Sequence, residues 1–377
     1  MTSGGKRKAE RIKSSPRRDR RVDPSESVQP SRSHPEPALD EETKSALAPA
    51  SKQPSRHQLQ MLWAVTVFGG AGLIGVLKYF SLLPEWVPRS IAVIVGCLLA
   101  VGLAIRSNGR WRLALLLSAL LGLAGLLIPM DAIRAGCAVG AATSGACLGV
   151  LVTKPAPRYL IAAREVAIAL AVALAGSLCA LGFTTNLDHV RFGYVVLALS
   201  LGGSVAMVYR LGAGLHGLGS RGYLMVAGAL ALLTLALAYT AALRQWGSLE
   251  INNSVNDVHT FIKETFYATP NLIASFVGIP ALAWGPFMRA RRRQGWWVTA
   301  FGTAATAPMT MIAVNRSLPL LESLVSMTYS VVLGLLIGYL LVRVEQFLDT
   351  GATSKRARRA EEDQAHRPEP SRMSPLH

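Results

Sequence analysis

The chain has 377 residues, of which 51% are hydrophobic and 16% are charged, whereas a soluble domain carries about 25% charged residues. This composition excludes an ordinary water-soluble protein, because the surplus of apolar side chains needs contact with lipid. The net charge of +17 would indicate nucleic-acid binding in a soluble chain, but here the basic residues lie in the tails and in short segments between apolar runs. We therefore expect the lipid bilayer as a partner and no nucleic acid.

Residues 1–57 form a polar tail. They are rich in Ser, Pro, Arg and Glu, and such a composition predicts disorder because it cannot bury enough surface to offset the entropy of ordering. The stretch from Lys6 to Arg21 holds nine Lys or Arg residues and is expected to be a solvated tail that helps to hold the N-terminus in the cytoplasm. The alternative is that it contacts anionic lipid head groups or a protein partner.

Ten apolar runs follow the tail, and each is about as long as a helix needs to cross a hydrocarbon core of roughly 30 Å. Backbone amides have no water to bond there, so these runs are predicted to be helices. They cover residues 61–82, 88–105, 113–130, 135–153, 165–183, 192–208, 223–243, 271–288, 296–314 and 318–342. The expected fold class is an all-α integral membrane protein, a polytopic bundle of about ten transmembrane helices.

Basic residues predict the orientation of this bundle. With the N-terminus inside, the four inner loops carry twelve Lys or Arg residues and the five outer loops carry six, as the positive-inside rule requires. Both termini are therefore expected in the cytoplasm. Arginine greatly outnumbers lysine, which is typical of a GC-rich bacterial genome, so the expected location is a bacterial plasma membrane. The inner set is Arg106, Arg110, Arg112, Lys154, Arg158, Arg164, Arg210, Arg221, Arg289, Arg291, Arg292 and Arg293.

The one long loop, residues 244–270, is predicted to be extracytoplasmic and amphipathic. Ser254 is a candidate helix cap, with Asp257 three residues later. We expect this helix to lie on the outer interface of the membrane or, as the alternative, to cover a transport pathway as a lid. Its apolar face consists of Val255, Val258, Phe261, Ile262 and Phe266.

The C-terminal residues 344–377 are predicted to be a second disordered tail in the cytoplasm. Six basic and six acidic residues follow Arg343, which leaves this tail near neutral. The expected organisation is therefore an N-terminal tail over 1–57, a transmembrane domain over 58–343 and a C-terminal tail over 344–377.

Charged residues inside predicted spans are candidates for a substrate or ion pathway, because each costs roughly 2.5–3.5 kcal/mol at the bilayer centre. Lys78 and Glu322 lie within predicted spans toward the outer leaflet, and Asp131 and Arg134 bracket the outer turn between the runs 113–130 and 135–153. A pair between Lys78 and Glu322, or a small cluster with Asp131 and Arg134, is the predicted site. The alternative is that these side chains snorkel to the interface and that Asp131 pairs locally with Arg134.

Polar stripes on the last two predicted spans indicate helices that face the interior of the bundle. Broken helices often line transporter sites, and Gly278, Pro280, Pro286 and Pro308 are candidate breaks. The alternative is ordinary hydrogen bonding between helices. The aligned residues are Thr303, Thr306 and Thr310 in the run 296–314, and Glu322, Ser326 and Tyr329 in the run 318–342.

Small residues predict which helix packs most closely. In the run 135–153, Gly136 with Gly140 and Gly145 with Gly149 form two small-xxx-small pairs. This run is therefore expected to contact a neighbouring helix backbone to backbone.

No motif indicates catalysis or a cofactor. The sequence Gly212-Ala-Gly214-Leu-His-Gly217 matches a dinucleotide-binding pattern, but no strand precedes it. None of the seven histidines lies within a predicted span, and the four cysteines form no CxxC pair or zinc pattern. We expect no catalytic residue, no cofactor and no metal.

The leading hypothesis for function is a secondary transporter or permease-like protein. Ten spans with both ends inside resemble the architecture of the drug/metabolite transporter superfamily, in which five helices repeat, although the loop 244–270 is longer than the loops of that group. The alternative is a non-catalytic scaffold, sensor or accessory protein of a cell-envelope pathway. A membrane enzyme is a third hypothesis, with Asp257, Glu264 or Glu322 as its acid.

Overall fold

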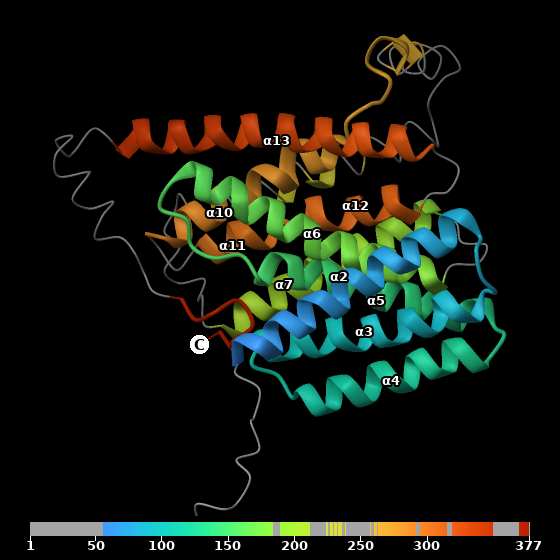
Figure 1. Ribbon diagram of the computed structural model, residues 1–377. Helices are drawn as coiled ribbons and strands as arrows, with labels where there is room; N and C mark the ends of the chain where they lie inside the picture. The colour runs from blue at the N-terminus through green and yellow to red at the C-terminus, as the bar shows by residue number, and fades with distance from the viewer. Residues whose placement is uncertain are drawn as a thin grey trace, which may run out of the picture. The chain divides into compact units, whose positions relative to one another are not determined.

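A computed structural model describes residues 56–183, 189–211, 263–291, 295–314, 319–349 and 369–376, with isolated residues between 224 and 261. The regular secondary structure of these residues is helical, with no strand among them (Figure 1). This confirms the predicted all-α fold. The predicted N-terminal tail, apart from its last two residues, and most of the predicted span 223–243 lie outside the described residues.

Among the described residues, six helices are long and apolar enough to cross a membrane, and each coincides with a predicted span. Their apolar runs form helices because a backbone in lipid must bond to itself. These helices support a membrane-embedded protein, while the count of ten spans and the orientation of the termini stay predictions. The six are α2 (Arg56–Phe80), α3 (Trp86–Arg106), α5 (Asp131–Leu151), α6 (Tyr159–Phe183), α7 (His189–Arg210) and α13 (Leu320–Asp349).

Three other predicted spans form shorter helices. The run 113–130 becomes α4 (Trp111–Leu127), which is apolar but has 17 residues. Of the two predicted spans between residues 271 and 314, the first is one continuous helix that contains a π-helical turn, and the second is divided by the turn at residues 301–302. They consist of the short π-helix η2 (Ala274–Gly278) followed by α10 (Ile279–Arg289), and of α11 (Gly295–Ala300) followed by α12 (Thr303–Val314).

Close contacts coincide with the π-helical turn of the first span and with the turn that divides the second. η2 ends at Gly278, a predicted break, where an added Cβ would lie 2.0 Å from a backbone atom of α12. α12 continues through Pro308, which was also a predicted break. The turn at residues 301–302 was not predicted, and there a Cβ on Gly302 would lie 2.3 Å from the side chain of Leu282. Tertiary packing therefore places one break that local sequence does not indicate.

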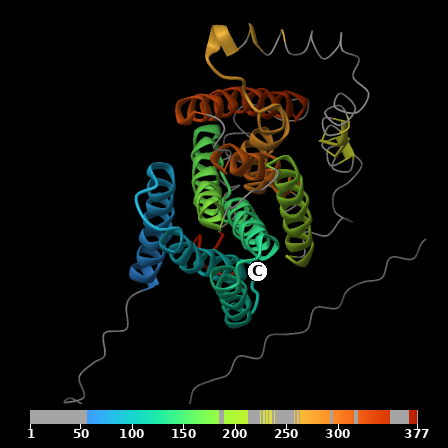
Figure 2. The ribbon, with the colours of Figure 1, turned by 90° about the vertical axis from the view of Figure 1, so that its right-hand side faces the viewer.

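Helix α6 packs against α2, α3, α5, α10 and α12 (Figures 1 and 2). Of its most apolar stretch 72% is buried, compared with 17% for α2 and 22% for α13. Its closest contact is with α5, where Gly145 faces Gly176 so tightly that a Cβ on Gly145 would lie 2.6 Å from the Gly176 Cα. Glycines therefore set the distance between the two central helices.

Helix α4 packs against α3 and α5 (Figure 1), and the rest of its surface is exposed leucine. A contiguous apolar surface of this kind is unusual on a soluble protein but is expected where lipid covers a helix. The exposed side chains are Leu113, Leu115, Leu116, Leu117, Leu120, Leu121, Leu123 and Leu127.

Only the later part of the predicted amphipathic loop is described. Residues 263–266 are helical, and the predicted apolar residues Phe261 and Phe266 are 65% and 53% exposed. The remaining members of that face lie outside the described residues. An exposed aromatic pair fits an interfacial helix, which stays a prediction here.

Candidate functional site

Lys78 and Glu322, the two charges that the sequence pairs, have different partners. Lys78, near the end of α2, is buried and forms an ion pair with Glu85, which lies in the turn before α3. Glu322, in the first turn of α13, pairs with Lys263, with 2.7 Å between Nζ and Oε1. The predicted Lys78 to Glu322 pair does not form. The reason is local, because α2 and α3 form a hairpin that brings Glu85 back to Lys78.

Asp131 and Arg134, the other predicted charges, do not pair with each other. Asp131 is exposed in the first turn of α5. Arg134, almost one turn later, interacts electrostatically with Arg89 of α3, and Arg89 lies 3.8 Å from Glu85. Arg134 therefore belongs to the same group of charges as Lys78, at the start of α3, whereas Glu322 belongs to a separate pair.

Three hydroxyl side chains of the predicted polar stripes donate hydrogen bonds to backbone carbonyls. Thr303 and Thr306 are fully buried; the Thr303 hydroxyl donates to the carbonyl of Ala300 at the end of α11 over 2.9 Å, and the Thr306 hydroxyl donates to a carbonyl of α5 over 3.2 Å. Ser326 donates to the carbonyl of Thr269 over 2.6 Å. Tyr329 is 36% exposed. These contacts agree with the alternative of hydrogen bonding between helices; the side chain of Thr310 lies outside the described residues.

A second group of charges, which the sequence did not single out, lies where α3 ends and α6 begins. We call it the Arg106 cluster, and define it as Arg106, Thr153, Glu165, Arg289 and Trp296. Its three ionisable side chains are 0%, 0% and 1% exposed, for Arg106, Glu165 and Arg289 respectively. Fully buried charges are rare unless they are paired, and in an apolar helical bundle they mark candidate binding sites.

Arg289, at the end of α10, has contacts with both Thr153 and Trp296 of the cluster. Its guanidinium donates to the hydroxyl and the carbonyl of Thr153 over 2.8 and 3.0 Å. Its Cζ stands 3.4 Å from the ring centroid of Trp296 on α11, a cation–π contact. Residues 292–294 lie outside the described residues, but α10 and α11 pack together, which brings the ring under the guanidinium.

Arg106 and Glu165 are the other two buried ionisable side chains of the cluster. The Arg106 Nε donates to the carbonyl of Leu151 over 2.8 Å. The Glu165 carboxylate accepts from the backbone N–H of Lys154 over 2.9 Å and from Arg164 over 3.1 Å. α5 ends where α3 ends and α6 begins, so that three helix ends place these groups side by side.

The C-terminal residues 369–376 fill the Arg106 cluster. Glu369 forms ion pairs with Arg289 and, at 3.9 Å, with Arg106. Arg372 forms a bidentate pair with Glu165, in which one of the two hydrogen bonds measures 2.7 Å. Arg106 also donates to two backbone carbonyls of the segment, those of Ser371 and Ser374, over 2.9 and 3.0 Å.

The end of the same segment is anchored by an apolar contact. Leu376 is 5% exposed and packs with Leu151, Trp296 and Trp297, and its backbone N–H donates to the Arg106 carbonyl over 3.1 Å. Disorder was predicted over 344–377, but residues 344–349 continue α13 and residues 369–376 are packed; residues 350–368 lie outside the described residues. Local composition missed this packing because its partners are remote in sequence.

This arrangement can hold opposite charges side by side. Two guanidinium groups converge on one carboxylate, while the neighbouring carboxylate holds a guanidinium. Among the described residues, the Arg106 Nη2, which lies 3.9 Å from Glu369, and the Arg289 Nε are buried and have no hydrogen-bond acceptor, so each arginine keeps a donor that these residues do not use. The cluster therefore has the chemistry to bind a carboxylate, or a solute that carries a carboxylate and a cation.

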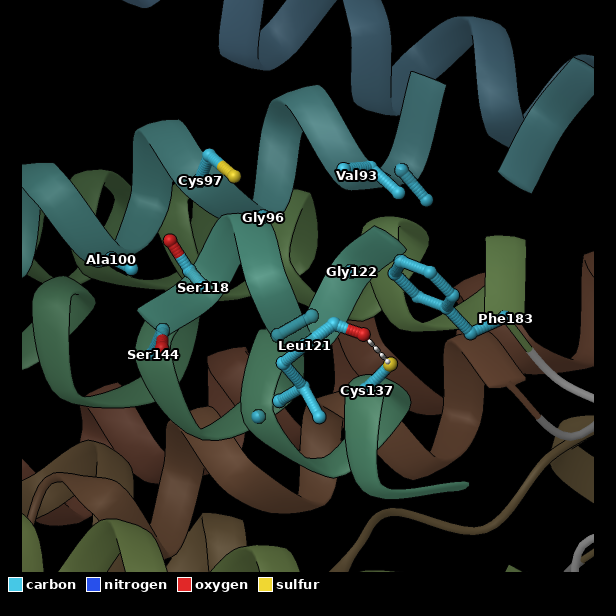
Figure 3. A pocket seen from close by; sticks show the side chains of 13 residues that line it. Val93, Gly96, Cys97, Ala100, Ser118, Leu121, Gly122, Cys137, Ser144 and Phe183 are labelled. Carbon is cyan, nitrogen blue, oxygen red and sulfur yellow. Dashed lines mark hydrogen bonds between the residues drawn. The ribbon is translucent and has the colours of Figure 1, made fainter. Parts of the chain in front are cut away.

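A separate apolar hollow of about 130 Å³ lies between α3, α4 and α5 (Figure 3). No charged side chain lines it. Its polar groups are the thiol of Cys137, which donates to the Leu121 carbonyl over 3.1 Å, together with Cys97 and two serines. This hollow therefore lacks the charged groups that would recognise a charged solute. The lining consists of Ala92, Val93, Gly96, Cys97, Ala100, Ser118, Leu121, Gly122, Cys137, Gly140, Ala141, Ser144 and Phe183.

Comparisons of this chain with protein-family models, with curated proteins and with solved structures gave no match. The function must therefore be argued from the site itself.

Proposed function

We propose that this chain is a secondary transporter or permease-like carrier for a carboxylate-bearing solute, with the Arg106 cluster as its binding site. One observation carries the proposal: Arg106 and Arg289, both fully buried, converge on a single carboxylate, that of Glu369. Paired guanidinium groups recognise carboxylates through charge-assisted hydrogen bonds.

The neighbouring helices support a carrier. Arg289 ends α10, which follows a π-helical turn, and the ring beneath it belongs to α11, which the turn at residues 301–302 separates from α12. In secondary transporters, discontinuous helices place helix ends at the substrate and allow one part of the bundle to move against the other. The site therefore includes a residue of α11, a helix that belongs to a divided span.

The test is solute uptake by the full chain in liposomes. Radiolabelled acetate, succinate and glutamate are the probes, with inorganic phosphate as the comparison anion. We expect saturable uptake of at least one carboxylate, and a loss of about tenfold or more in apparent affinity in Arg289→Gln, because one charge-assisted hydrogen bond is removed.

Arg291→Gln is the matched control. It removes the same charge two residues away, where the guanidinium contacts Phe287 and not the cluster, so its uptake should equal that of the parent chain. Absence of saturable uptake in both the full chain and Glu369→Gln, a variant in which the segment loses its carboxylate, would refute a carrier.

A second candidate is a non-catalytic scaffold, sensor or accessory membrane protein. The observation that favours it is that Arg106, Glu165 and Arg289 all have partners within the chain, as a purely structural network would. In that case Arg289→Gln lowers thermal stability while liposomes containing the parent chain take up no probe.

A further inference from the structure

We infer that residues 369–376 are a displaceable occupant of the Arg106 cluster, and that a carboxylate-bearing solute competes with Glu369 for Arg106 and Arg289. This inference rests on the proposed function, because it names what regulates access to the proposed site. The first step is that the segment binds as a ligand would. It forms no helix or strand of its own, and its polar contacts to the bundle are made to groups of α2, α3, α6 and α10 and to Val152, the residue after α5.

The charges of the segment complement those of the bundle one by one. The bundle contributes Arg106, Arg289 and Glu165 to the buried site. The segment adds Glu369 where the two arginines converge and Arg372 where the glutamate lies. The Glu369 carboxylate and the Arg372 guanidinium therefore resemble the two charges of a dipolar solute, and they occupy the place in the cluster where such a solute would bind.

The segment cannot simply leave the cluster empty. Its departure would remove the carboxylate of Glu369 from two guanidinium groups, and a charge that loses its partner inside a bundle is unfavourable. A small anion that replaces Glu369 removes this cost. Exchange of one carboxylate for another is therefore favoured over an open and vacant site.

The contacts that hold the segment are of a kind that a solute can replace. Apart from Leu376 and a contact between Met373 and the region of Gly102, they are ion pairs and hydrogen bonds. Arg372 has a side chain that is 27% exposed, so water reaches this edge of the segment. A tethered segment competes at an effective concentration on the order of millimolar, which sets the range in which a free carboxylate displaces it.

The experiment measures exposure of the segment in the purified full chain. Ser374→Cys supplies a thiol of nearly the same size and keeps the backbone carbonyl that bonds to Arg106. Cys97→Ala removes the one native cysteine that is partly exposed, since the other three are buried. The readout is the rate at which a maleimide labels the new thiol, with sodium succinate or with sodium chloride at the same ionic strength.

We expect succinate to raise the labelling rate on the order of tenfold relative to chloride, the factor that follows from replacing one charge-assisted contact. Glu369→Gln should raise the rate without any succinate and should also increase carboxylate uptake by liposomes. Glu345→Gln is the control, because Glu345 lies on α13 and accepts from Trp284 outside the cluster, so it should leave the labelling rate unchanged.

Two results separate this inference from the proposed function. A rate that responds to succinate and to Glu369→Gln, in a chain that transports no carboxylate, supports the displaceable segment and refutes the carrier. Saturable uptake together with a labelling rate that neither change affects supports the carrier and overturns the inference, because the segment is then a fixed part of the fold. An equal response to chloride also overturns it, since competition for the site would be absent.

Discussion

Glu165 shows how a charge is kept inside this bundle. Its side chain is 0% exposed, and its two carboxylate oxygens accept from a backbone N–H, from Arg164 and from Arg372. A buried carboxylate is stable only when such donors replace its lost hydration. The acid is therefore tied to its neighbours, and the Arg106 cluster depends on it for charge balance.

Removing this charge should destabilise the protein. Glu165→Gln leaves Arg372 without its bidentate partner and leaves Arg106 and Arg289 balanced by Glu369 alone. We expect a loss of about 2–3 kcal/mol, toward the lower end of what breaking one side of a buried pair costs, since Arg372 is partly solvated. The measurement is thermal unfolding in detergent. Arg164→Gln is the control, because that side chain is 64% exposed; equal losses in both variants would contradict this account.

At the scale of helices, the contact between α5 and α6 depends on particular glycines. A Cβ on Gly145 would lie 2.6 Å from the Gly176 Cα, and one on Gly149 would lie 2.5 Å from the Ala169 carbonyl oxygen. By contrast, a Cβ on Gly136 would meet nothing within 4 Å. Two of the four glycines on one helix therefore set the distance between the helices.

Alanine substitutions distinguish these positions. Gly145→Ala should lower stability by about 1–3 kcal/mol, because backbone cannot move aside as a side-chain end can and the helices must separate. Gly136→Ala, in the same helix, should leave stability equal or slightly higher, since alanine favours helix and the space is open. Both are measured by thermal unfolding in the same detergent. A larger loss in Gly136→Ala would show that this helix contact is wrongly placed.

The sequence predicts the helices of this protein correctly where a long apolar run would lie in lipid. Long apolar runs such as α6 must be helical because no other backbone partner exists in a bilayer. The small-xxx-small pattern identified the helix of close contact, but which of its glycines meet α6 depends on how the helices are rotated. The turn at residues 301–302 likewise follows from the approach of Leu282 to Gly302, which no local pattern indicates.

At the scale of the whole molecule, the candidate site could not be predicted because its members are distant in sequence. Arg106 and Arg289 end apolar runs, where arginine normally reports loop orientation, and Glu165 begins one. Their common partner Glu369 is 80 residues from Arg289 and lies in a polar segment whose composition favours disorder. Only the folded chain brings these charges together.

The contacts of residues 369–376 with the Arg106 cluster also bear on which side of the membrane this C-terminal segment lies. Residues 369–376 reach Arg106 and Arg289, so the C-terminal segment lies at the end of the bundle that carries the Arg106 cluster. Lys263 pairs with Glu322 in the first turn of α13, whereas Glu345, near the other end of that helix, contacts Trp284 of α10. Lys263 and the C-terminal segment therefore lie at opposite ends of α13.

Single cysteines at these two places test the predicted orientation. Since basic residues favour the cytoplasm, Lys263→Cys should react with an impermeant maleimide in intact cells. Ser374→Cys should react only after the membrane is opened, and only as fast as the segment leaves its site. Cys97→Ala in both variants removes background labelling. If both thiols react from the same side, α13 does not cross the bilayer; if the pattern is reversed, α13 crosses but the predicted cytoplasmic location of the C-terminus is wrong.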